Sequence, residues 1–417
     1  MVKNLDSKEA LILERSIRLL KYLFLNEPQP PFKLILTPTD RCNLNCFFCP
    51  NFVARKEGRF KPEDEMIDDE WISIIDQGIK LGVRQWCLLG GGEPLLRREI
   101  ILPLLEKIKR KSPVIDLEII TNGTLFTKEI IEELVKTCKE RIRNGEEKTA
   151  IQTTISIHGG ERTFHEITGA SLYETVINNV KLITNLKKGF KLKYFIVQIN
   201  IVVNKRNLNE IENFISTLAN IGVDQVALHP IHVYEETKEI IKNEIPTTEE
   251  YESILRFVKK LMPLFPDLRI DTLSLTSYLQ QFNPKFKHEN YDNKVENKTI
   301  EQKYDFLKFR CFEPWYDMLI NPDGRVGRCA AFVTRNEPIS VKRESLGDVW
   351  FGDFLNKVRL NVRNGILMEG CSPCALMSNT IVIKRELEKL IEINPEDITQ
   401  VIKEAERLVN EFYLHLY

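Results

Sequence analysis

The sequence predicts an α/β fold in which a partial (β/α)6 TIM-like barrel is followed by a small cysteine-rich domain. Apolar, β-branched runs alternate six times with helical periodicities, and four of the nine cysteines gather near the C-terminus. Nearly continuous apolar strands separated by helices are typical of a parallel sheet that helices cover. Six strand–helix units are too few for a closed eight-fold barrel, so we expect an open one, with reactive groups at the C-terminal ends of its strands.

The pattern of residues places each element. A helical periodicity covers Ser7 to Leu25, and the proline-rich run 27–31 ends it. The expected strands are Phe32–Leu36, Val83–Leu89, Val114–Ile120, Ala150–Ile157, Tyr194–Val203 and Asp224–Leu228. The expected helices are Asp68–Leu81, Glu99–Lys111, Lys128–Ile142, Leu172–Leu186, Leu208–Ile221 and Glu249–Leu264.

Changes of composition along the chain predict its domains. Residues 280–308 are rich in Asn, Lys, Gln and Tyr, which favours a connecting segment or lid over a core element. We therefore expect an N-terminal helix (1–31), the barrel (32–265), the connecting segment or lid (266–310), the cysteine-rich domain (311–378) and C-terminal helices packed on the body (379–417).

Composition excludes several classes of function. The 417 residues include 59 Lys plus Arg and 60 Asp plus Glu, so there is no basic excess to bind a nucleic-acid backbone. No apolar stretch is long enough for a signal peptide or a membrane span, and we expect a cytoplasmic protein. Cysteines in a reducing compartment indicate metal sites rather than disulfides.

Three cysteines follow the first expected strand at a close spacing: Cys42, Cys46 and Cys49. Three thiolates on one loop can ligate three irons of a 4Fe-4S cluster, which leaves the fourth iron open for a ligand. A zinc knuckle or incidental thiols are the alternatives. A zinc site would need a fourth Cys or His, and the flanking dozen residues contain none.

The segment Thr39–Pro50 resembles the cluster loop of the radical S-adenosylmethionine (SAM) superfamily. The resemblance implies that the open iron binds the amino and carboxylate groups of SAM and that Phe48 lies against the adenine. It also implies that one-electron reduction splits SAM into methionine and a 5′-deoxyadenosyl radical, which abstracts a hydrogen atom from the substrate.

Further motifs of this family follow on successive strands, and the resemblance covers residues 32 to about 230. In the GGEP-like segment, Gly91, Gly92 and Glu93 would hold the methionyl amino group, although a tight turn would also explain the glycines. The turn containing Asn122 resembles the family's TNG turn, and the Ser156 hydroxyl would touch the SAM ribose. Many relatives have Asp where this chain has His158, so the role of that position stays open.

A second set of cysteines consists of Cys311, Cys329, Cys371 and Cys374. The turn Asn321–Gly324 predicts a hairpin that brings the first two together. Four thiolates fill a second 4Fe-4S cluster completely. The set resembles the auxiliary-cluster modules called SPASM and twitch. Thr380 stands where the full SPASM pattern has a further cysteine, so the shorter twitch form fits better; a structural zinc site is the alternative.

Other polar and sulfur-containing residues are harder to assign. We expect Cys87 and Cys138 to be small buried hydrophobes. His229 and His232 follow the sixth strand, and a hydrogen-bonded structural role is favoured over substrate contact. Lys205 and Arg206 follow the fifth strand, where they would be able to reach an anionic substrate or the SAM carboxylate. A solvated loop is the simpler interpretation and is favoured.

These features favour a radical SAM oxidoreductase that oxidises a substrate C–H bond and passes the electron to the second cluster. The cysteine layout resembles that of twitch dehydrogenases, which oxidise an alcohol on an aminoglycoside precursor. A radical SAM peptide maturase is the alternative, although the 31 residues before the first strand are too few for a winged-helix recognition domain. A non-catalytic iron–sulfur or zinc protein is the third possible function. Expected partners are a small-molecule or peptide substrate and a ferredoxin or flavodoxin reductant; no catalytic acid or base is identified.

Overall fold

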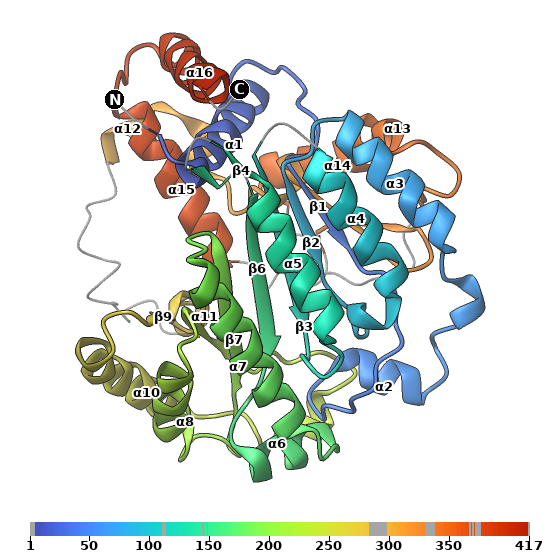
Figure 1. The fold of residues 1–417 in the computed structure, drawn as a ribbon. Coiled ribbons are helices and arrows are strands. Elements are labelled where there is room, and N and C mark those ends of the chain that lie inside the picture. Colours follow the sequence, from blue (N-terminus) through green and yellow to red (C-terminus); the bar gives the residue numbers. More distant parts are fainter. Residues whose placement is uncertain are drawn as a thin grey trace.

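A sheet forms the centre of the structure, and helices cover one of its faces (Figure 1). Within the described residues, the computed structural model orders nine strands as β11-β10-β1-β2-β3-β6-β7-β8-β9. Every neighbouring pair is parallel except β10 and β11. The strands are β1 (Lys33–Leu36), β2 (Gln85–Leu88), β3 (Ile115–Thr121), β6 (Thr149–Ser156), β7 (Phe195–Val203), β8 (Gln225–Pro230), β9 (Arg269–Asp271), β10 (Asp317–Ile320) and β11 (Val326–Gly327), with a separate hairpin of β4 (Ile142–Arg143) and β5 (Glu146–Glu147).

The structure describes residues 5–110, 114–143, 146–147, 149–282, 298–329, 338–366, 368, 371 and 377–415. Part of the predicted lid, 283–297, lies outside them, as does Cys374. The predicted domain boundaries stay predictions.

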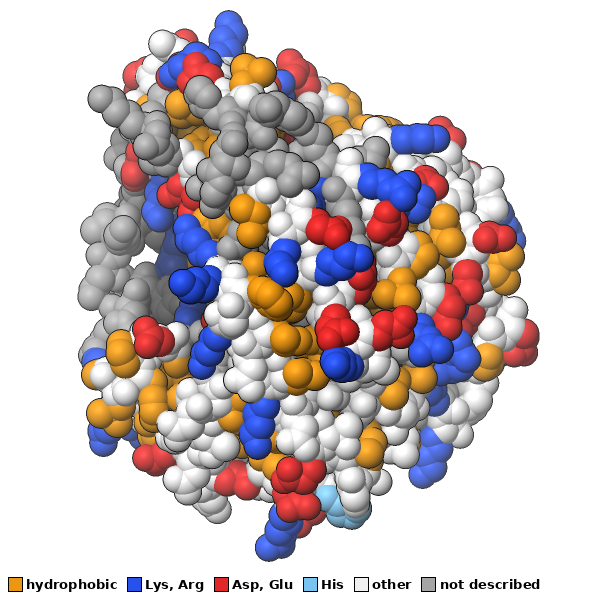
Figure 2. All heavy atoms as spheres, viewed as in Figure 1, with side chains coloured by type: hydrophobic (Ala, Val, Ile, Leu, Met, Phe, Trp, Pro, Cys, Tyr) orange, Lys and Arg blue, Asp and Glu red, His pale blue; other side chains and the backbone are white. Residues whose placement is uncertain are grey.

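Helices alternate with the parallel strands, and α3, α4, α5 and α7 lie side by side on the covered face (Figure 1). The predicted six strand–helix units, and with them the partial barrel, are confirmed. On this face basic and acidic side chains are interspersed (Figure 2), in keeping with the net charge of −1. The barrel helices are α2 (Pro50–Lys56), α3 (Asp68–Lys80), α4 (Arg98–Arg110), α5 (Lys128–Glu140), α6 (Glu161–Thr168), α7 (Tyr173–Phe190), α8 (Ile211–Ile221), α9 (Lys238–Ile241) and α10 (Thr248–Leu261), with short 3-10 helices at Pro62–Asp64, Pro94–Arg97 and Met262–Leu264.

Local signals set the ends of these helices. The Thr127 hydroxyl accepts a hydrogen bond from the Ile130 N–H and so caps the start of α5. At the end of α8, Gly222 adopts a left-handed conformation with φ of 88°, which glycine allows without strain. The helices therefore begin and end close to the residues that the sequence predicts.

The two faces of the sheet differ in character. Side chains on the helix-covered face, such as Leu117, Ile151 and Val197, are fully buried and belong to the main hydrophobic core. On the opposite, inner face the alternate positions of β3 and β7 keep partial exposure. Such an alternation leaves the inside of the partial barrel accessible to a ligand.

The cysteine-rich segment contributes strands to the barrel sheet itself. Lys33 of β1 pairs with Asp317 of β10, and the register continues to Leu36 and Ile320. The predicted hairpin at Asn321–Gly324 is confirmed, because β10 and β11 run antiparallel on either side of it. The C-terminal segment is thus joined to β1 by backbone hydrogen bonds.

The N-terminal helix and the C-terminal helices pack together in a second hydrophobic cluster. Leu19 and Leu20 of α1 lie there with Leu387 of α15 and Ala405 of α16. The expectation that the C-terminal helices pack on the body is confirmed. No helix in the described part of the chain combines the length and apolar character needed to cross a bilayer. These outer helices are α1 (Ser7–Leu23), α11 (Leu273–Phe282), α12 (Lys298–Lys303), α13 (Leu346–Phe351), α14 (Asp353–Arg363), α15 (Met377–Ile391) and α16 (Ile398–His415), with 3-10 helices at Asp305–Lys308 and Glu313–Trp315.

Candidate functional site

The loop with the first three cysteines lies between β1 and α2, at the C-terminal edge of the sheet. Cys49 is the residue before α2, and Pro50 occupies its first turn, where no backbone donor is needed. The Cys49 N–H donates to the Cys46 carbonyl at 3.0 Å, and the Leu44 N–H donates to the Cys42 sulfur at 3.5 Å. These contacts fold the loop tightly, as the spacing of its cysteines predicts.

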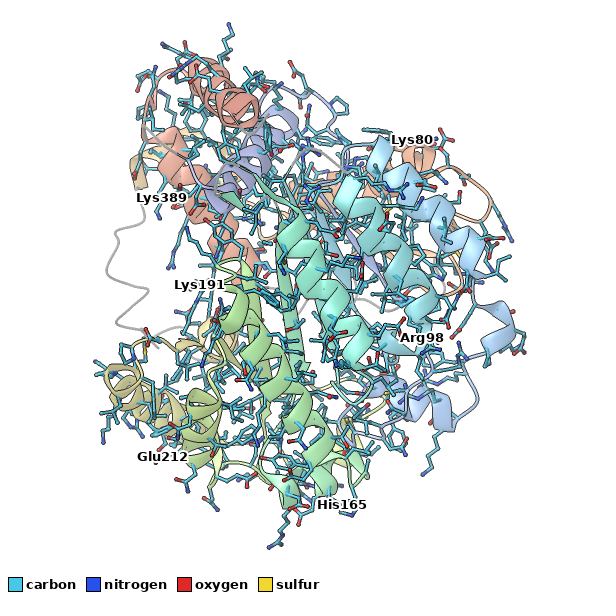
Figure 3. All side chains as sticks on the ribbon, viewed as in Figure 1. Lys80, Arg98, His165, Lys191, Glu212 and Lys389 are labelled. Carbon is cyan, nitrogen blue, oxygen red and sulfur yellow. The ribbon has the colours of Figure 1, made fainter. Side chains whose placement is uncertain are left out.

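Neighbouring elements hold this loop from one side. The Asn45 and Phe47 N–H groups donate to the carbonyls of Thr168 and Ile167 in α6, at 2.9 and 3.1 Å. Figure 3 shows His165 of the same helix at the lower end of the molecule, far from Lys80 at the C-terminal end of α3. The loop is therefore fixed to the end of the barrel at which the strands terminate.

Arg55 of α2 holds the loop from the other side. Its guanidinium donates to the carbonyls of Asp40, Leu44 and Gly91, at 3.1, 3.3 and 3.5 Å. Arg55 therefore joins the part of the loop around Cys42 to the glycine-rich segment after β2. The sequence analysis missed Arg55, because a single arginine on a short helix carries no pattern.

The electrostatics of the three thiols suit a cationic cofactor. Burial raises the pKa of Cys46 well above its usual value, and the neighbouring Cys49 and Cys42 thiolates raise it further. Burial also raises the pKa of Cys42. Three thiolates this close repel one another, and a bound iron cluster would remove that repulsion. In the described residues, no three Cys, His, Asp or Glu side chains are close enough together to bind one metal ion. An iron–sulfur cluster does not require this, because each of its thiolate ligands binds a different iron.

The glycine-rich segment approaches the cysteine loop backbone to backbone. The Gly92 N–H donates to the Thr39 carbonyl at 2.9 Å, and the Glu93 N–H donates to the Arg41 carbonyl at 2.8 Å. A Cβ atom at Gly92 would lie 1.9 Å from the Arg41 carbonyl oxygen. Only glycine fits at this position, because any side chain would clash with the cysteine loop. A tight turn alone would not explain this requirement.

Glu93 is 2% exposed and joins the ends of β2 and β3. Its Oε1 accepts hydrogen bonds from the Thr121 hydroxyl at 2.6 Å and the Leu95 N–H at 3.0 Å, and its Oε2 accepts one from the Asn122 N–H at 2.8 Å. Burial raises the pKa of Glu93, while these hydrogen bonds lower it. The carboxylate thus fixes the turn after β3, and Oε2 keeps capacity for one more donor.

Asn122 connects that turn to the cysteine loop. Its Nδ2 donates to Asn43 Oδ1 at 2.9 Å and lies 3.9 Å from the Cys42 sulfur. Its Oδ1 accepts a hydrogen bond from the Thr124 hydroxyl, which in turn accepts one from Asn43 Nδ2. Asn43, between the first two cysteines, is a second residue that the sequence analysis missed.

Phe48, Ser156 and His158 lie on the β6 side of the loop. The Phe48 ring contacts the His158 ring edge-on, with centroids 5.1 Å apart. Ser156 ends β6 and pairs with Asn200 of β7 on the partly exposed inner face. Of the predicted SAM-binding residues, Phe48 belongs to the cysteine loop, and the others lie at the ends of β2, β3 and β6.

The basic residues after β7 are engaged within the protein. Lys205 Nζ lies 3.0 Å from Glu250, and Arg206 is paired with Glu244 at 2.8 Å. The Arg206 guanidinium also lies 4.1 Å from the centre of the Phe47 ring. Arg206 thus supports the cysteine loop, and the sequence analysis did not assign this role.

His229 differs from the hydrogen-bonded structural histidine that the sequence favours. Its Nε2 is buried and has no hydrogen-bond partner among the residues that the structure describes. His232 contacts the Tyr278 ring, with centroids 5.9 Å apart. Burial lowers the pKa of His229 to about 4 and also lowers that of His232, so both rings are neutral near pH 7.

Two cysteines, Cys87 and Cys138, belong to neither set, and both are buried, as the sequence predicts. Cys138 lies in the main core, whereas Cys87 faces the inside of the barrel beside Ile35 and Leu319.

The second cysteine set is described only in part. Cys311 precedes the 3-10 helix at 313–315, and Cys329 follows β11. The β10–β11 pairing ends at Gly327, two residues before Cys329. The Cys371 N–H donates to the Met368 carbonyl at 3.1 Å. Since Cys374 lies outside the described residues, the four-ligand site stays a prediction.

Comparison with known proteins agrees with this geometry. Residues 36–215 match the model of the radical SAM superfamily, and residues 311–375 match that of an iron–sulfur cluster-binding domain named SPASM. A probable GTP 3′,8-cyclase of Sulfurisphaera tokodaii is 26% identical over 261 residues, 62% of this chain and 70% of the relative. One of Saccharolobus solfataricus is 30% identical over 206 residues, 49% of this chain, and the match spans only 58% of that protein.

Solved structures share the fold. Streptococcus suis SuiB bound to S-adenosylmethionine aligns over 86% of this chain and 73% of its own, with a TM-score of 0.56 and 18% identity. The anSMEcpe structure with bound AdoMet and Cp18Cys peptide aligns over 91% of this chain and 100% of its own, with a TM-score of 0.53 and 13% identity. With a cysteine loop of matching spacing and two matching family models, this chain contains a radical SAM domain over residues 36–215 and a C-terminal SPASM-type iron–sulfur cluster-binding domain over residues 311–375.

Proposed function

We propose that this chain cleaves SAM reductively at a 4Fe-4S cluster on Cys42, Cys46 and Cys49 and oxidises a substrate C–H bond with the resulting 5′-deoxyadenosyl radical. The observation that supports the proposal most is the cysteine loop, held by Arg55 against the glycine-rich segment and by α6 on its other side. When bound, the cluster supplies the electron that breaks the carbon–sulfur bond of SAM. The protein supplies position and exclusion of water.

Six residues around the loop would hold SAM. The Glu93 carboxylate has capacity for a proton of the methionyl ammonium, and its contacts to Thr121 and Asn122 keep it in place. The remaining five would contact the methionyl, adenine and ribose groups, namely Phe48, Gly91, Gly92, Asn122 and Ser156.

A second 4Fe-4S cluster on Cys311, Cys329, Cys371 and Cys374 would accept the electron that the substrate loses. Four thiolates leave no open iron, so such a cluster is suited to electron transfer rather than to substrate binding. A peptide maturase is the second candidate, favoured by the similar fold of SuiB, which was solved bound to its precursor peptide SuiA, and GTP 3′,8-cyclases are similar in sequence. The reductant would be a ferredoxin or flavodoxin, and the substrate a small molecule or a peptide.

Anaerobic, cluster-loaded protein tests the first part. With dithionite and SAM it is expected to release 5′-deoxyadenosine and methionine in equal amounts, and Cys46→Ser should abolish the release. An exposed control, Glu63→Gln, should leave it unchanged. Release that is absent from the wild-type protein, or equal in the Cys46→Ser variant, would contradict the proposal and favour a non-catalytic iron–sulfur protein.

Iron analysis tests the second cluster. Wild-type protein is expected to hold about eight irons and eight sulfides per chain, and Cys371→Ala about four of each. The variant should still cleave SAM, because its first cluster is intact. Zinc in place of iron at the second site, or an unchanged iron content in the variant, would show that the electron acceptor is misassigned.

A further inference from the structure

The two cysteine sets lie toward opposite ends of the sheet. The first set follows β1, at the C-terminal edge, whereas Cys311 of the second set comes before β10, a strand parallel to β1. Phe312, the next residue, packs in a hydrophobic cluster with Phe32 and Val114, which precede β1 and β3. An electron carrier bound beside the first set is therefore poorly placed to exchange electrons with the second.

The proposed reaction requires an outlet for one electron at the second set. For each SAM cleaved, one electron enters the protein at the first set. The substrate then gives a hydrogen atom to the 5′-deoxyadenosyl radical, and it loses one proton and one further electron as it becomes the oxidised product. The electron that arrives at the second set has to leave the protein before the next turnover, and a carrier that binds close to this set would accept it.

The helix α14 lies beside two segments that carry cysteines of the second set. Arg359 Nε donates to the Pro314 carbonyl at 2.9 Å, which holds α14 against the 3-10 helix that follows Cys311. Ile366, just after α14, precedes Cys371 by five positions, so their Cα atoms are at most about 18 Å apart. The outer face of α14 is thus close to the second set.

That outer face is basic and apolar. Leu360 and Ile366 are 55% and 52% exposed, although the opposite face of α14 is buried. Residues 354–366 contain three basic residues and no acidic residue. In the described part of the chain, Lys357 has no ion pair, and Arg363 contacts the neutral Asn26 Oδ1 at 3.4 Å. We name these four exposed residues the α14 surface: Lys357, Leu360, Arg363 and Ile366.

The chemistry of the α14 surface suits a transient protein partner of opposite charge. Apolar side chains that are not needed in the core exclude water at the centre of an interface, and the basic side chains around them attract an acidic surface. Interfaces between redox proteins are among the smallest that proteins form, so a surface of this size is sufficient.

We propose that the α14 surface is the docking site of a small, acidic electron-carrier protein, which takes up the electron delivered to the second set. The proposal rests on the proposed function, because that function delivers the electron. Each docking event oxidises the second set by one electron and reduces the carrier by one electron. One electron thus enters this protein at the C-terminal edge of the sheet and one leaves beside α14 in every turnover.

Isothermal calorimetry of the anaerobic, cluster-loaded protein with oxidised flavodoxin, an acidic flavin protein, measures docking. Lys357→Glu is expected to weaken binding about fivefold at low salt, and the double change with Arg363→Glu more than tenfold. Added salt should weaken binding of the wild-type protein more than that of the double variant. Lys181→Glu is the matched control, since Lys181 is an exposed helical lysine without an ion pair among the described residues, and it should keep wild-type affinity.

Electron transfer is measured separately, as flavin semiquinone formed when dithionite-reduced protein, freed of dithionite, is mixed with oxidised flavodoxin. Cys371→Ala should bind flavodoxin with wild-type affinity but form semiquinone more slowly. The proposal is overturned if flavodoxin does not bind the wild-type protein, if Lys357→Glu and Lys181→Glu bind it equally, or if Cys371→Ala forms semiquinone at the wild-type rate. A wild-type protein that holds only one cluster by iron analysis would instead count against the proposed function.

Discussion

At the scale of single residues, Asp116 shows how the inner face of the barrel affects ionisation. Asp116 lies on the inner face of β3, where its Oδ2 accepts a hydrogen bond from Gln85 Nε2 at 3.1 Å. Burial raises its pKa to about 6, and the nearby Glu118 carboxylate adds to the increase. The folded protein thus binds a proton here that the unfolded chain releases near pH 4.

This shift predicts how stability depends on pH. Because the folded-state pKa lies above the ordinary value of 3.8, the stabilisation from Asp116 is present below about pH 4 and is lost as pH rises through about 6. Relative to the wild-type protein, Asp116→Asn should therefore gain at most about 3 kcal/mol in the free energy of unfolding between pH 4 and pH 7. Urea denaturation at both pH values measures the gain. An identical pH dependence in both proteins would show that Asp116 ionises normally.

Single residues also mark how far sequence reasoning extends. Cys42, Glu93 and Asn122 are found from sequence because their chemistry and spacing form a motif. Arg55 and Asn43 are not found, because they act on backbone carbonyls and side chains that only folding brings together. His158 is noticed only as a departure from the family, and its Nδ1 accepts a hydrogen bond from the Val202 N–H on another strand.

At the scale of elements, a close backbone contact joins the turn after β2 to the loop after β1. At Gly92 this contact leaves no room for a side chain, since an added Cβ would lie 1.9 Å from the Arg41 carbonyl oxygen. Because backbone atoms on both sides are hydrogen-bonded, neither segment can easily move away.

Gly92→Ala is therefore expected to lower the free energy of unfolding by about 3 kcal/mol or more and to weaken binding of S-adenosyl-L-homocysteine. Gly189→Ala is the matched control: its Cβ would meet nothing within 4 Å, in the helix α7. That variant should be more stable by about 0.5–1 kcal/mol, because alanine favours a helix. Chemical denaturation of both variants measures the two changes; a stable Gly92→Ala protein would show that the two loops separate readily.

Most elements could be predicted because each carries its own periodicity. The six parallel strands and their helices lie within a few residues of the predicted ranges. The short helices α2 and α6 were not predicted, because 7 or 8 residues show little periodicity. Their positions depend instead on the cysteine loop, which α6 binds through its last carbonyls.

At the scale of the whole molecule, the two ends of the chain complete one structure. β10 pairs with β1, and α1 packs against α15 and α16. The sequence predicts the C-terminal helices and the hairpin, but not the pairing of β10 with β1. That pairing joins residues almost 300 positions apart, and no local pattern encodes it.

A chain shortened to residues 1–265 should consequently fail to fold as an independent barrel. It would expose the edge of β1 and the apolar face of α1, including Leu19 and Leu20. We expect aggregation or loss of a cooperative unfolding transition, measured by light scattering and circular dichroism. A monomeric truncated chain with a cooperative transition would show that the barrel is a separate folding unit.

The backbone pairing of β10 with β1 also constrains the exchange of C-terminal modules between enzymes of this architecture. The Met66 N–H donates to the Pro322 carbonyl at 2.6 Å, and the Thr37 N–H donates to the Ile320 carbonyl at 3.0 Å, just ahead of the cysteine loop. A transplanted module would have to reproduce an edge strand in the same alignment, or the recipient would lose the support beneath its radical-generating centre. Recombination should therefore preserve the barrel and its module as a pair.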